Sequence, residues 1–334
     1  MVNEISPIMP FVPVYQNHHL NSWAYITSRS LVDVEIAKKI DKKTGLIILN
    51  RNNTYFYFNP AHIDIDGRGQ QLLMLYIEKF TKSVRHGASK DEILRNKTIR
   101  FSVSEIAKEF GVTVKQARKM VIKASFAMQL MAIVWYDDMV NRKGLHSTNI
   151  LQGFDYYEDD GPNPASLKRG EMQVVLADKF ALKLPELYIM WYPTSIRKIP
   201  LRQYTSANAF AMLLSEHYNF KYGTSESNRI RVPLLLEATR DIPKYEKVSA
   251  GAGQFHKRIV APFVKNLDVL VEKGFLKEWH LEKDGEACPR EDYKKLRHAF
   301  FVDCFVHFEI LDFPVEKKEK SIARQMKRDN ASAS

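Results

Sequence analysis

Hydrophobic and polar positions in the first third of the chain predict short strands followed by a helix. Residues 45–60 (GLIILNRNNTYFYFNP) alternate, which predicts two strands joined by a hairpin turn at residues 50–53. Residues 70–84 (QQLLMLYIEKFTKSV) instead carry their apolar side chains at helical spacing. Residues 98–103 (TIRFSV) predict a further short strand, whereas the aperiodic residues 1–30 are expected to form an extended arm.

Residues 101–121 (FSVSEIAKEFGVTVKQARKMV) predict two helices separated by a tight turn, the pattern of a helix-turn-helix. Ser102 or Ser104 can cap the first helix through a side-chain hydroxyl. Gly111 can end that helix in the left-handed conformation, and Thr113 can cap the second helix. The apolar side chains expected to face inward from the second helix are Val114, Ala117, Val121 and Phe126.

Residues 132–156 follow this helix pair with apolar segments on either side of a basic tip. AIVWYDD, then NRKGLH, then STNILQGFDYY predict two strands and a Gly-containing turn, which together make a β-wing. Helix, turn, helix and wing in that order predict a winged-helix domain.

The second half repeats this order of elements with different residues. The predicted elements are a strand that begins residues 170–181, an amphipathic helix over 205–220, a short strand entering a helix within 229–240, a long helix over about 254–273, and two strands, within 275–285 and 298–311, around a charged loop. Pro262 is expected near the start of the long helix or at a kink in it, and Gly274 is expected to end it. This order predicts a second winged helix.

The sequence therefore predicts an α+β fold with two tandem, pseudo-symmetric winged-helix domains. The predicted divisions are an N-terminal arm (1–30), a first winged-helix domain (31–155), a Pro/Gly-rich linker (156–170), a second winged-helix domain (171–313), and a basic C-terminal tail (314–334). Within the tail, residues 317–328 are expected either to form a basic helix that touches DNA or a partner, or to remain solvated.

The balance of charge indicates a polyanionic partner. The chain has 50 Lys and Arg against 39 Asp and Glu, which gives a formal net charge of +11. Each phosphate that a cation neutralises releases condensed counterions, so an excess of cations favours nucleic acid. The N-terminus does not look like a signal peptide, and no apolar stretch approaches 18 residues, so we expect a cytoplasmic protein without a membrane partner.

The two cysteines, Cys288 and Cys304, are too few for a four-ligand zinc site or a disulfide framework. They are interpreted as unpaired thiols in a reducing compartment. Trp135, Trp191 and Trp279 lie in apolar, strand-like segments and are expected in the core.

The candidate DNA-binding residues lie on the second helix of each predicted helix pair and on the first wing. They are Thr113, Lys115, Gln116, Arg118, Lys119 and Lys123 on the first helix, Arg142 and Lys143 at the wing tip, and Gln254, His256, Lys257, Arg258 and Lys265 on the second helix. A helix fits the major groove, where Arg or Lys reads guanine and the Gln116 or Gln254 amide can read adenine. The remaining cations would position the protein on phosphates.

The second half resembles the C-terminal winged helix of iteron-binding plasmid replication initiators. The shared features are a strand with a small capping helix, a helix of the type S-x-x-A followed by Leu, a Tyr-containing loop, and a helix that opens with basic residues and continues x-P-x-x-x-x-L. The matching residues are Ser206, Ala209, Leu213, Tyr245, Lys257, Arg258, Pro262 and Leu267. The resemblance covers about half the chain, and the first winged helix matches only in plan. The longer N-terminal arm and the basic extension after Pro314 depart from the family.

The resemblance implies a sequence-specific replication initiator of a plasmid or mobile element. In that family two winged helices bind successive major grooves of a repeated origin site. The C-terminal one reads bases, while the N-terminal one contacts phosphates and dimerises. Monomers open the origin and recruit host replication proteins, namely the helicase machinery and the host initiator, and dimers often repress their own gene.

Two alternatives remain open. A transcriptional regulator would use the same twin modules, with an effector site between them. A primase-like enzyme would use Asp64 and Asp66, which share one strand face with His62 in the segment AHIDIDGRG.

An enzyme is not the favoured prediction, and no cofactor or metal is expected. His18 and His19 lack the spacing of a relaxase metal site, and no Gly-rich phosphate loop ends in Lys-Ser or Lys-Thr.

Overall fold

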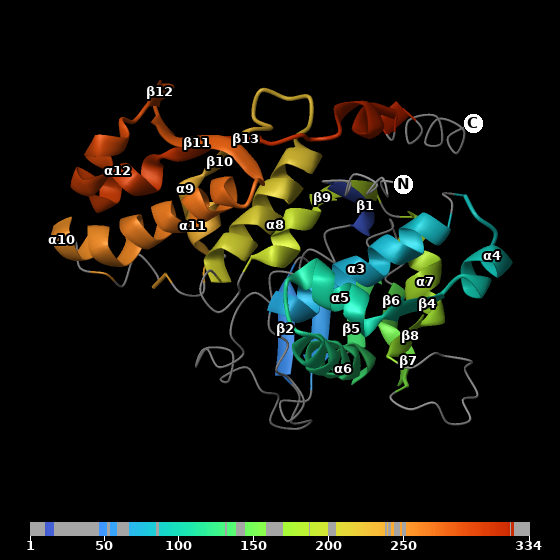
Figure 1. Ribbon diagram of the computed structural model, residues 1–334. Helices are drawn as coiled ribbons and strands as arrows, with labels where there is room; N and C mark the ends of the chain where they lie inside the picture. The colour runs from blue at the N-terminus through green and yellow to red at the C-terminus, as the bar shows by residue number, and fades with distance from the viewer. Residues whose placement is uncertain are drawn as a thin grey trace, which may run out of the picture. The chain divides into compact units, whose positions relative to one another are not determined.

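The computed structural model divides the chain into two compact units. The N-terminal unit comprises residues 15–188 and 200–205, and the C-terminal unit comprises residues 1–14, 189–199 and 206–334. The residues that the structure describes are 11–16, 47–51, 54–58, 67–84, 87–130, 132–137, 144–157, 170–186, 188–199, 205–237, 239, 242–243, 248, 252–320 and 322–323. Both units mix helices with small antiparallel sheets, which confirms an α+β fold (Figure 1).

The N-terminal unit begins with a strand pair and ends with a short helix. Its elements are β2 (Ile47–Arg51), β3 (Thr54–Phe58), α3 (Gly67–Ser83), α4 (Lys90–Arg95), β4 (Thr98–Ser102), α5 (Val103–Phe110), α6 (Val114–Leu130), β5 (Ala132–Asp137), β6 (Gly144–Asn149), β7 (Leu151–Tyr156), β8 (Glu171–Leu176), α7 (Asp178–Lys183) and the 3-10 turn η2 (Leu184–Glu186). The predicted helix over residues 70–84 is α3, and the predicted strand over 98–103 is β4. Arg51 pairs with Thr54 in an antiparallel register, so the predicted hairpin is confirmed.

Helix α3 forms the core of the N-terminal unit. Its apolar side chains Leu72, Tyr76, Ile77 and Phe80 are completely buried. The Tyr76 hydroxyl lies 3.0 Å from Ser125 Oγ on α6, and the Tyr76 ring stacks on Phe101 of β4. One buried tyrosine thus joins α3 to both a helix and a strand.

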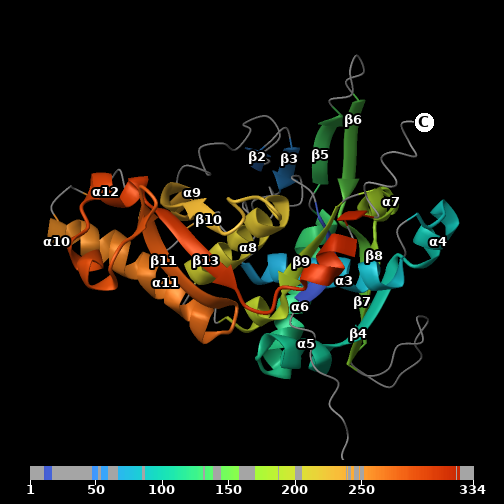
Figure 2. The same ribbon diagram turned by 90° about the horizontal axis from the view of Figure 1, so that it is seen from above.

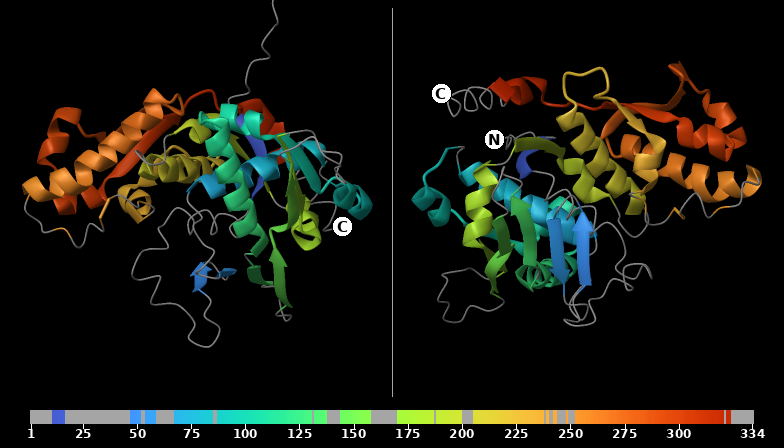
Figure 3. Two further views of the ribbon diagram at one scale, coloured as in Figure 1. Left: turned by 60° about the horizontal axis from the view of Figure 1, so that its bottom comes forward. Right: turned by 180° about the vertical axis from the view of Figure 1, so that it is seen from behind.

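Two antiparallel sheets complete this unit. One has the strand order β2-β3-β5-β6, and Figure 3 shows its blue and green strands side by side. The other has the order β4-β8-β7, so β8 lies between two strands that precede it in sequence.

The position of β8 corrects the predicted domain boundary. Residues 156–170 were expected to be a linker, but Tyr157 and Gly170 close a hairpin: the Gly170 N–H donates to the Tyr157 carbonyl at 2.9 Å. The strand at 171–176 was assigned to the second domain, yet its buried Met172, Val174 and Leu176 complete the sheet of the first. A strand with one buried face needs neighbours, and β4 and β7 supply them.

The C-terminal unit is built on one long helix and a four-stranded sheet. Its elements are β1 (Phe11–Gln16), β9 (Tyr188–Pro193), the 3-10 turn η3 (Thr194–Lys198), α8 (Thr205–Phe220), β10 (Arg229–Arg231), α9 (Val232–Glu237), α10 (Ala252–Phe255), the π-turn η5 (His256–Val260), α11 (Ala261–Glu272), β11 (Leu276–Lys283), β12 (Glu286–Ala287), the 3-10 turn η6 (Arg290–Lys295), α12 (His298–Asp303) and β13 (Phe305–Ile310). The sheet order is β10-β13-β11-β12. The predicted strand entering a helix is confirmed as β10 followed by α9.

The predicted arm and the predicted second strand need correction. Residues 11–16 of the arm form β1, which pairs with β9 in a two-stranded sheet. Residues 298–303, which were expected to begin a strand, form helix α12, and β13 starts only at Phe305. Phe301 of α12 is completely buried, whereas Phe300 is 37% exposed, so this segment packs one aromatic side chain as a helix before the chain enters the sheet.

Pro262 shapes the long helix as predicted. The Ala261 N–H bonds to the His256 carbonyl five residues earlier, so a wide π-turn precedes Pro262 in the second position of α11. Proline has no N–H, and its ring displaces the carbonyl four residues before it, which favours a local wide turn.

The start of the predicted basic tail is a docked segment. Residues 315–320 are helical, and Lys318 is only 7% exposed. Its Nζ donates to Asn219 Oδ1 at 3.2 Å, and the Asn219 side chain also bonds the backbone N–H and carbonyl of Trp191. Trp191 itself is buried, as is Trp279, whereas the side chain of Trp135 lies outside the described residues.

Replacing Lys318 should stabilise the protein in a pH-dependent way. Burial lowers the pKa of Lys318 from 10.5 to about 8. Between these two values the unfolded chain binds the extra proton, so wild-type stability rises with pH through that window. Lys318→Met should therefore raise the free energy of unfolding at pH 7 by roughly 1–3 kcal/mol, and the gain should shrink towards pH 10.5.

Urea unfolding of both proteins at a series of pH values measures this difference. Lys320→Met, at an exposed position of the same segment, is the matched control and should change little at any pH. A constant difference between Lys318→Met and wild type from pH 7 to 10 would contradict the prediction.

Candidate nucleic-acid interface

Local hydrogen bonds build the turn between α5 and α6. Ser102 caps α5, since its Oγ accepts the Glu105 N–H at 3.0 Å. Gly111 ends α5 with φ +61°, in the left-handed region that glycine tolerates. Both helix signals predicted from the sequence are confirmed.

Thr113 and Gln116 form a reciprocal capping box at the start of α6. Thr113 Oγ1 accepts the Gln116 N–H at 3.2 Å, and Gln116 Oε1 accepts the Thr113 N–H at 3.0 Å. This pair satisfies two backbone donors at once and fixes where the helix begins. The predicted cap is confirmed, and the Gln116 amide oxygen is already occupied.

The inward face of α6 runs along different residues from those expected. Ala117 and Val121 are buried as predicted, but Val114 and Phe126 are 55% and 52% exposed. The buried stripe continues instead through Ala124, Ser125, Ala127 and Met128. Phe126 falls beside this stripe, where its ring meets the edge of Phe154 at 4.8 Å between centroids.

The outward face of α6 carries the predicted cations. Lys115, Lys119 and Lys123 are exposed, and Arg118 is half-buried beside them. Lys115 and Lys123 lie eight residues apart, so the row extends for about 12 Å along the helix. The α6 sequence contains no acidic residue. The helix therefore presents a cationic surface to solvent.

An antiparallel hairpin follows α6 directly. Strands β5 and β6 pair from Ala132 with Asn149 to Asp137 with Gly144, and Figure 2 shows them as an extended two-stranded ribbon. The first predicted wing strand is confirmed. The second was predicted within residues 147–157, but it runs from Gly144 to Asn149, and Leu151–Tyr156 forms β7 of the other sheet. Arg142 and Lys143, expected at its tip, lie outside the described residues.

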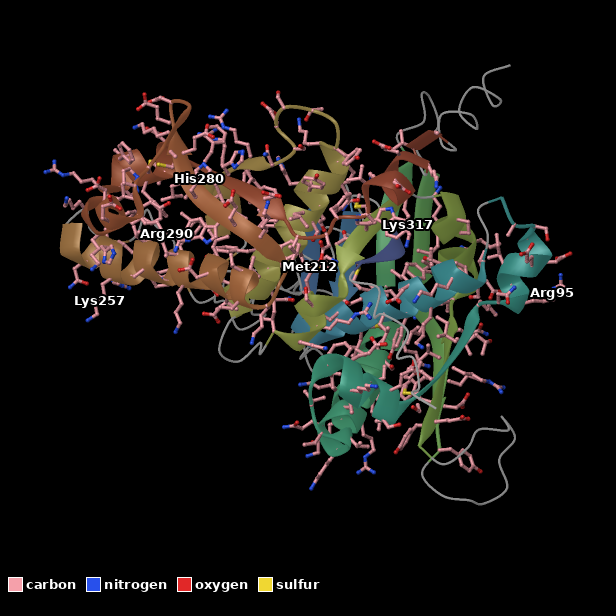
Figure 4. All side chains as sticks on the ribbon, turned by 45° about the horizontal axis from the view of Figure 1, so that its top comes forward. Arg95, Met212, Lys257, His280, Arg290 and Lys317 are labelled. Atoms are coloured by element: carbon pink, nitrogen blue, oxygen red, sulfur yellow. The ribbon has the colours of Figure 1, made fainter. Side chains whose placement is uncertain are left out.

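The long helix of the C-terminal unit has a comparable division between its faces. Phe255, Ile259, Val260 and Phe263 are completely buried. His256 is half-buried. The other predicted DNA-binding residues on this helix are exposed, namely Gln254, Lys257, Arg258 and Lys265. Figure 4 shows Lys257 near the outer end of the helix, pointing away from the sheet. No acidic residue occurs between Ala252 and Lys265.

The hairpin after this helix has an acidic tip. Lys283 pairs with Glu286, and Asp284 and Gly285 between them have φ values of +54° and +87°. Two successive residues at positive φ make a tight hairpin turn for which Asp-Gly is favoured. Of the charged residues from 282 to 286, only Lys283 is basic, so this tip would repel phosphate.

A second cationic segment lies beside the long helix and was not singled out from the sequence. Turn η6 and the residues after it expose Lys294, Lys295 and Arg297. The run KKLR in the sequence was the available signal, but it was assigned to a charged loop.

The structure offers no metal site among the described residues, where no group of three His, Cys, Asp or Glu side chains is placed to hold an ion. His62, Asp64 and Asp66 of the primase-like alternative lie outside those residues, as do His18, His19 and Tyr245. Cys288 and Cys304 are both free, as predicted. Burial raises the pKa of the Cys304 thiol to about 12, so it stays protonated at neutral pH. None of the described helices has the length and apolar character needed to cross a membrane.

Comparisons with known proteins give only distant similarities. No protein-family model matches the sequence, and no curated protein matches it. The structure is similar to a crystal structure of the Pi initiator protein in complex with iteron DNA, at 12% identity and a TM-score of 0.45, covering 79% of this chain and 99% of that one. It is also similar to a crystal structure of domains 2 and 3 of RctB, at 13% identity and a TM-score of 0.46, covering 87% of this chain and 98% of that one.

The first of these proteins is, by its description, an initiator in complex with iteron DNA. Because both TM-scores are below 0.5, the assignment of the two units depends on their own geometry and not on these similarities.

Loss of the α6 cap should destabilise the N-terminal unit. Thr113→Ala removes the acceptor for the Gln116 N–H and should lower the free energy of unfolding by about 1 kcal/mol. Thr113→Ser keeps a hydroxyl at the cap and should stay within a few tenths of a kcal/mol of wild type. Urea unfolding monitored by circular dichroism measures both variants, and equal stability of Thr113→Ala and wild type would show that the capping box is dispensable.

Proposed function

We propose that this protein is a sequence-specific, double-stranded DNA-binding replication initiator built from two tandem winged-helix modules. The observation that carries the proposal is that each unit contains one helix with a buried apolar face and an exposed cationic face. In both units a helix buries its apolar stripe, exposes cations and leads into an antiparallel hairpin. No acidic residue occurs in α6 or between residues 252 and 265 of the long helix.

The order of elements supports a winged helix in each unit. In the N-terminal unit, α5, a tight turn, α6 and the β5–β6 hairpin follow one another. In the C-terminal unit, β10, α9, the α10–α11 helix, β11 and β13 follow in the same sense, and β10 closes the sheet against β13. In this class of module the second helix enters the major groove and the hairpin lies against the neighbouring backbone.

The exposed side chains suit this docking. Lys257 and Arg258 can read guanine or contact phosphate, and Gln254 can read adenine through its amide. Lys115, Arg118, Lys119 and Lys123 can neutralise phosphates from α6, a term that binds any sequence and weakens with salt. Two such modules on one chain lengthen the bound site and add their affinities through their tether.

Initiation of replication is the finer part of the proposal. It rests on the sequence resemblance to iteron-binding initiators, whose matching residues Ser206 and Ala209 lie buried in α8, and Leu267 in α11. By this resemblance, the protein would act in the cytoplasm on repeated origin sites. It would form homodimers and recruit host helicase and host initiator proteins. We propose no enzymatic activity for either unit.

Footprinting on the element's own DNA distinguishes initiation from transcriptional regulation. We expect protection that recurs across direct repeats beside the gene, together with reactive, unpaired bases in an adjacent AT-rich tract. Permanganate probing detects those bases. Protection of a single operator without any unpaired bases would favour the regulator.

Removing the cations of the C-terminal helix should weaken binding to the repeat. Lys257→Ala with Arg258→Ala should lower the affinity at least tenfold and reduce the slope of log K against log salt by about one for each phosphate that is no longer neutralised. Fluorescence anisotropy with a labelled repeat duplex at several salt concentrations measures both quantities.

The matched control is Lys221→Ala with Lys320→Ala, two exposed cations on other parts of the same unit. This pair should leave the affinity within about twofold. Equal affinities and slopes for the helix variant and wild type would remove the C-terminal helix from the proposed interface.

A further inference from the structure

The chain does not run directly from β12 into β13. It forms turn η6 and helix α12, and we name residues 290–298 the η6 arm. Turn η6 packs against η5 of the long helix. The Phe255 ring lies 5.2 Å from the ring of His298 and 5.9 Å from that of Phe301. Figures 1 and 2 both show α12 beside α10, so the η6 arm adjoins the turn that carries Lys257 and Arg258.

Two buried side chains attach the η6 arm to the sheet. Tyr293 is 4% exposed, and its hydroxyl accepts the Leu281 N–H of β11 at 2.8 Å. Leu296 is 8% exposed. The arm is thus a fixed part of the unit, and its exposed side chains have defined positions.

Arg290 at the start of the η6 arm has a structural role. Its Nη2 donates to Asp268 Oδ1 at 2.9 Å, and its guanidinium lies over the Trp279 ring at 4.8 Å. The same Asp268 oxygen accepts the Trp279 Nε1–H at 2.9 Å. This cation is therefore already paired within the protein, and Figure 4 labels it on the C-terminal unit.

The other cations of the η6 arm are directed outward. Lys294, Lys295 and Arg297 alternate with the buried Tyr293 and Leu296, and all three are exposed. Lys295 forms an ion pair with Asp292 at 2.9 Å, which partly neutralises it. Among the described residues, Lys294 and Arg297 have no carboxylate partner within ion-pair distance. Two cations thus stand unneutralised beside the proposed DNA-reading helix.

We propose that the η6 arm, through Lys294 and Arg297, is a second phosphate-binding surface of the C-terminal module. This inference rests on the proposed function and adds the phosphate contact that a wing would usually supply. The hairpin tip carries Asp284 and Glu286, and Glu282 beside it is paired with Arg229, so the tip is unsuited to phosphate. A helix docked in the major groove lies between two sugar–phosphate strands about 12 Å apart, so a cationic element at its side meets one of them.

The acidic residues of the η6 arm do not cancel this surface. Glu291 and Asp292 lie at the start of η6, and Asp292 is paired with Lys295. The end nearest the Phe255–His298 contact carries Arg297 instead. The cationic end of the arm therefore lies towards the proposed DNA-reading helix.

The double variant Lys294→Ala with Arg297→Ala tests the inference in the full-length protein. Affinity for a repeat duplex should fall about tenfold or more, and the slope of log K against log salt should drop by about two. The bases protected in a footprint should stay the same, because the arm contacts phosphate and not base edges. Lys294→Glu with Arg297→Glu should cause a larger decrease in affinity for the same duplex.

Lys295→Ala is the matched control within the arm, since its charge is already paired, and it should have the smaller effect. Thermal unfolding of each variant checks that the exposed substitutions leave the fold intact. If wild type binds the duplex while both double variants match it in affinity and slope, the arm does not bind phosphate. If wild type itself fails to bind duplex DNA at about 50 mM salt, the proposed function is overturned instead.

Discussion

The packing of Phe263 between Phe210 and Phe301 is the contact on which the C-terminal unit depends. The Phe263 ring centroid lies 5.1 Å from that of Phe210 on α8 and 5.3 Å from that of Phe301 on α12. Phe301 continues the row to Phe255, one residue after Gln254. Because these rings bury one face of the long helix, the opposite face must meet solvent, and that face carries the exposed cations Lys257, Arg258 and Lys265.

In the N-terminal unit, small side chains bury one face of α6 and leave the opposite face exposed. Ala117, Ala124 and Ala127 lie on the buried face of α6, where they let neighbouring helices approach closely. The Tyr76–Ser125 hydrogen bond joins α6 to α3, and this pairing satisfies two polar atoms that would otherwise be costly to bury. Two unrelated packing solutions therefore leave one cationic helix face in each unit. A shared function explains this outcome better than shared sequence does.

Features with a local cause could be predicted from the sequence, and features with a distant cause could not. Gly111, Thr113 and Pro262 act on their own turns, so the helix boundaries near them were predicted correctly. Strand β8 was assigned to the wrong unit because its partners, β4 and β7, cannot be identified from its own alternation. Lys318 was placed in a solvated or DNA-binding tail, since no local signal shows that a lysine will be buried against Asn219. The η6 arm was missed because the packing of Phe255 against His298, which places its cations beside the long helix, cannot be identified from the local sequence.

The capping box gives the two proposed modules different abilities to read sequence. Reading adenine through a glutamine requires both the amide oxygen and the amide nitrogen. Gln116 Oε1 already accepts the Thr113 N–H, so reading a base would require giving up a bond that holds the start of α6. Gln254 is exposed at the start of its helix and has no such partner among the described residues. Base reading is therefore favoured in the C-terminal module, and α6 is left with lysines and one arginine, which suit phosphates. The proposed division of roles would follow from hydrogen bonds that the protein makes on its own, such as that between Gln116 and Thr113.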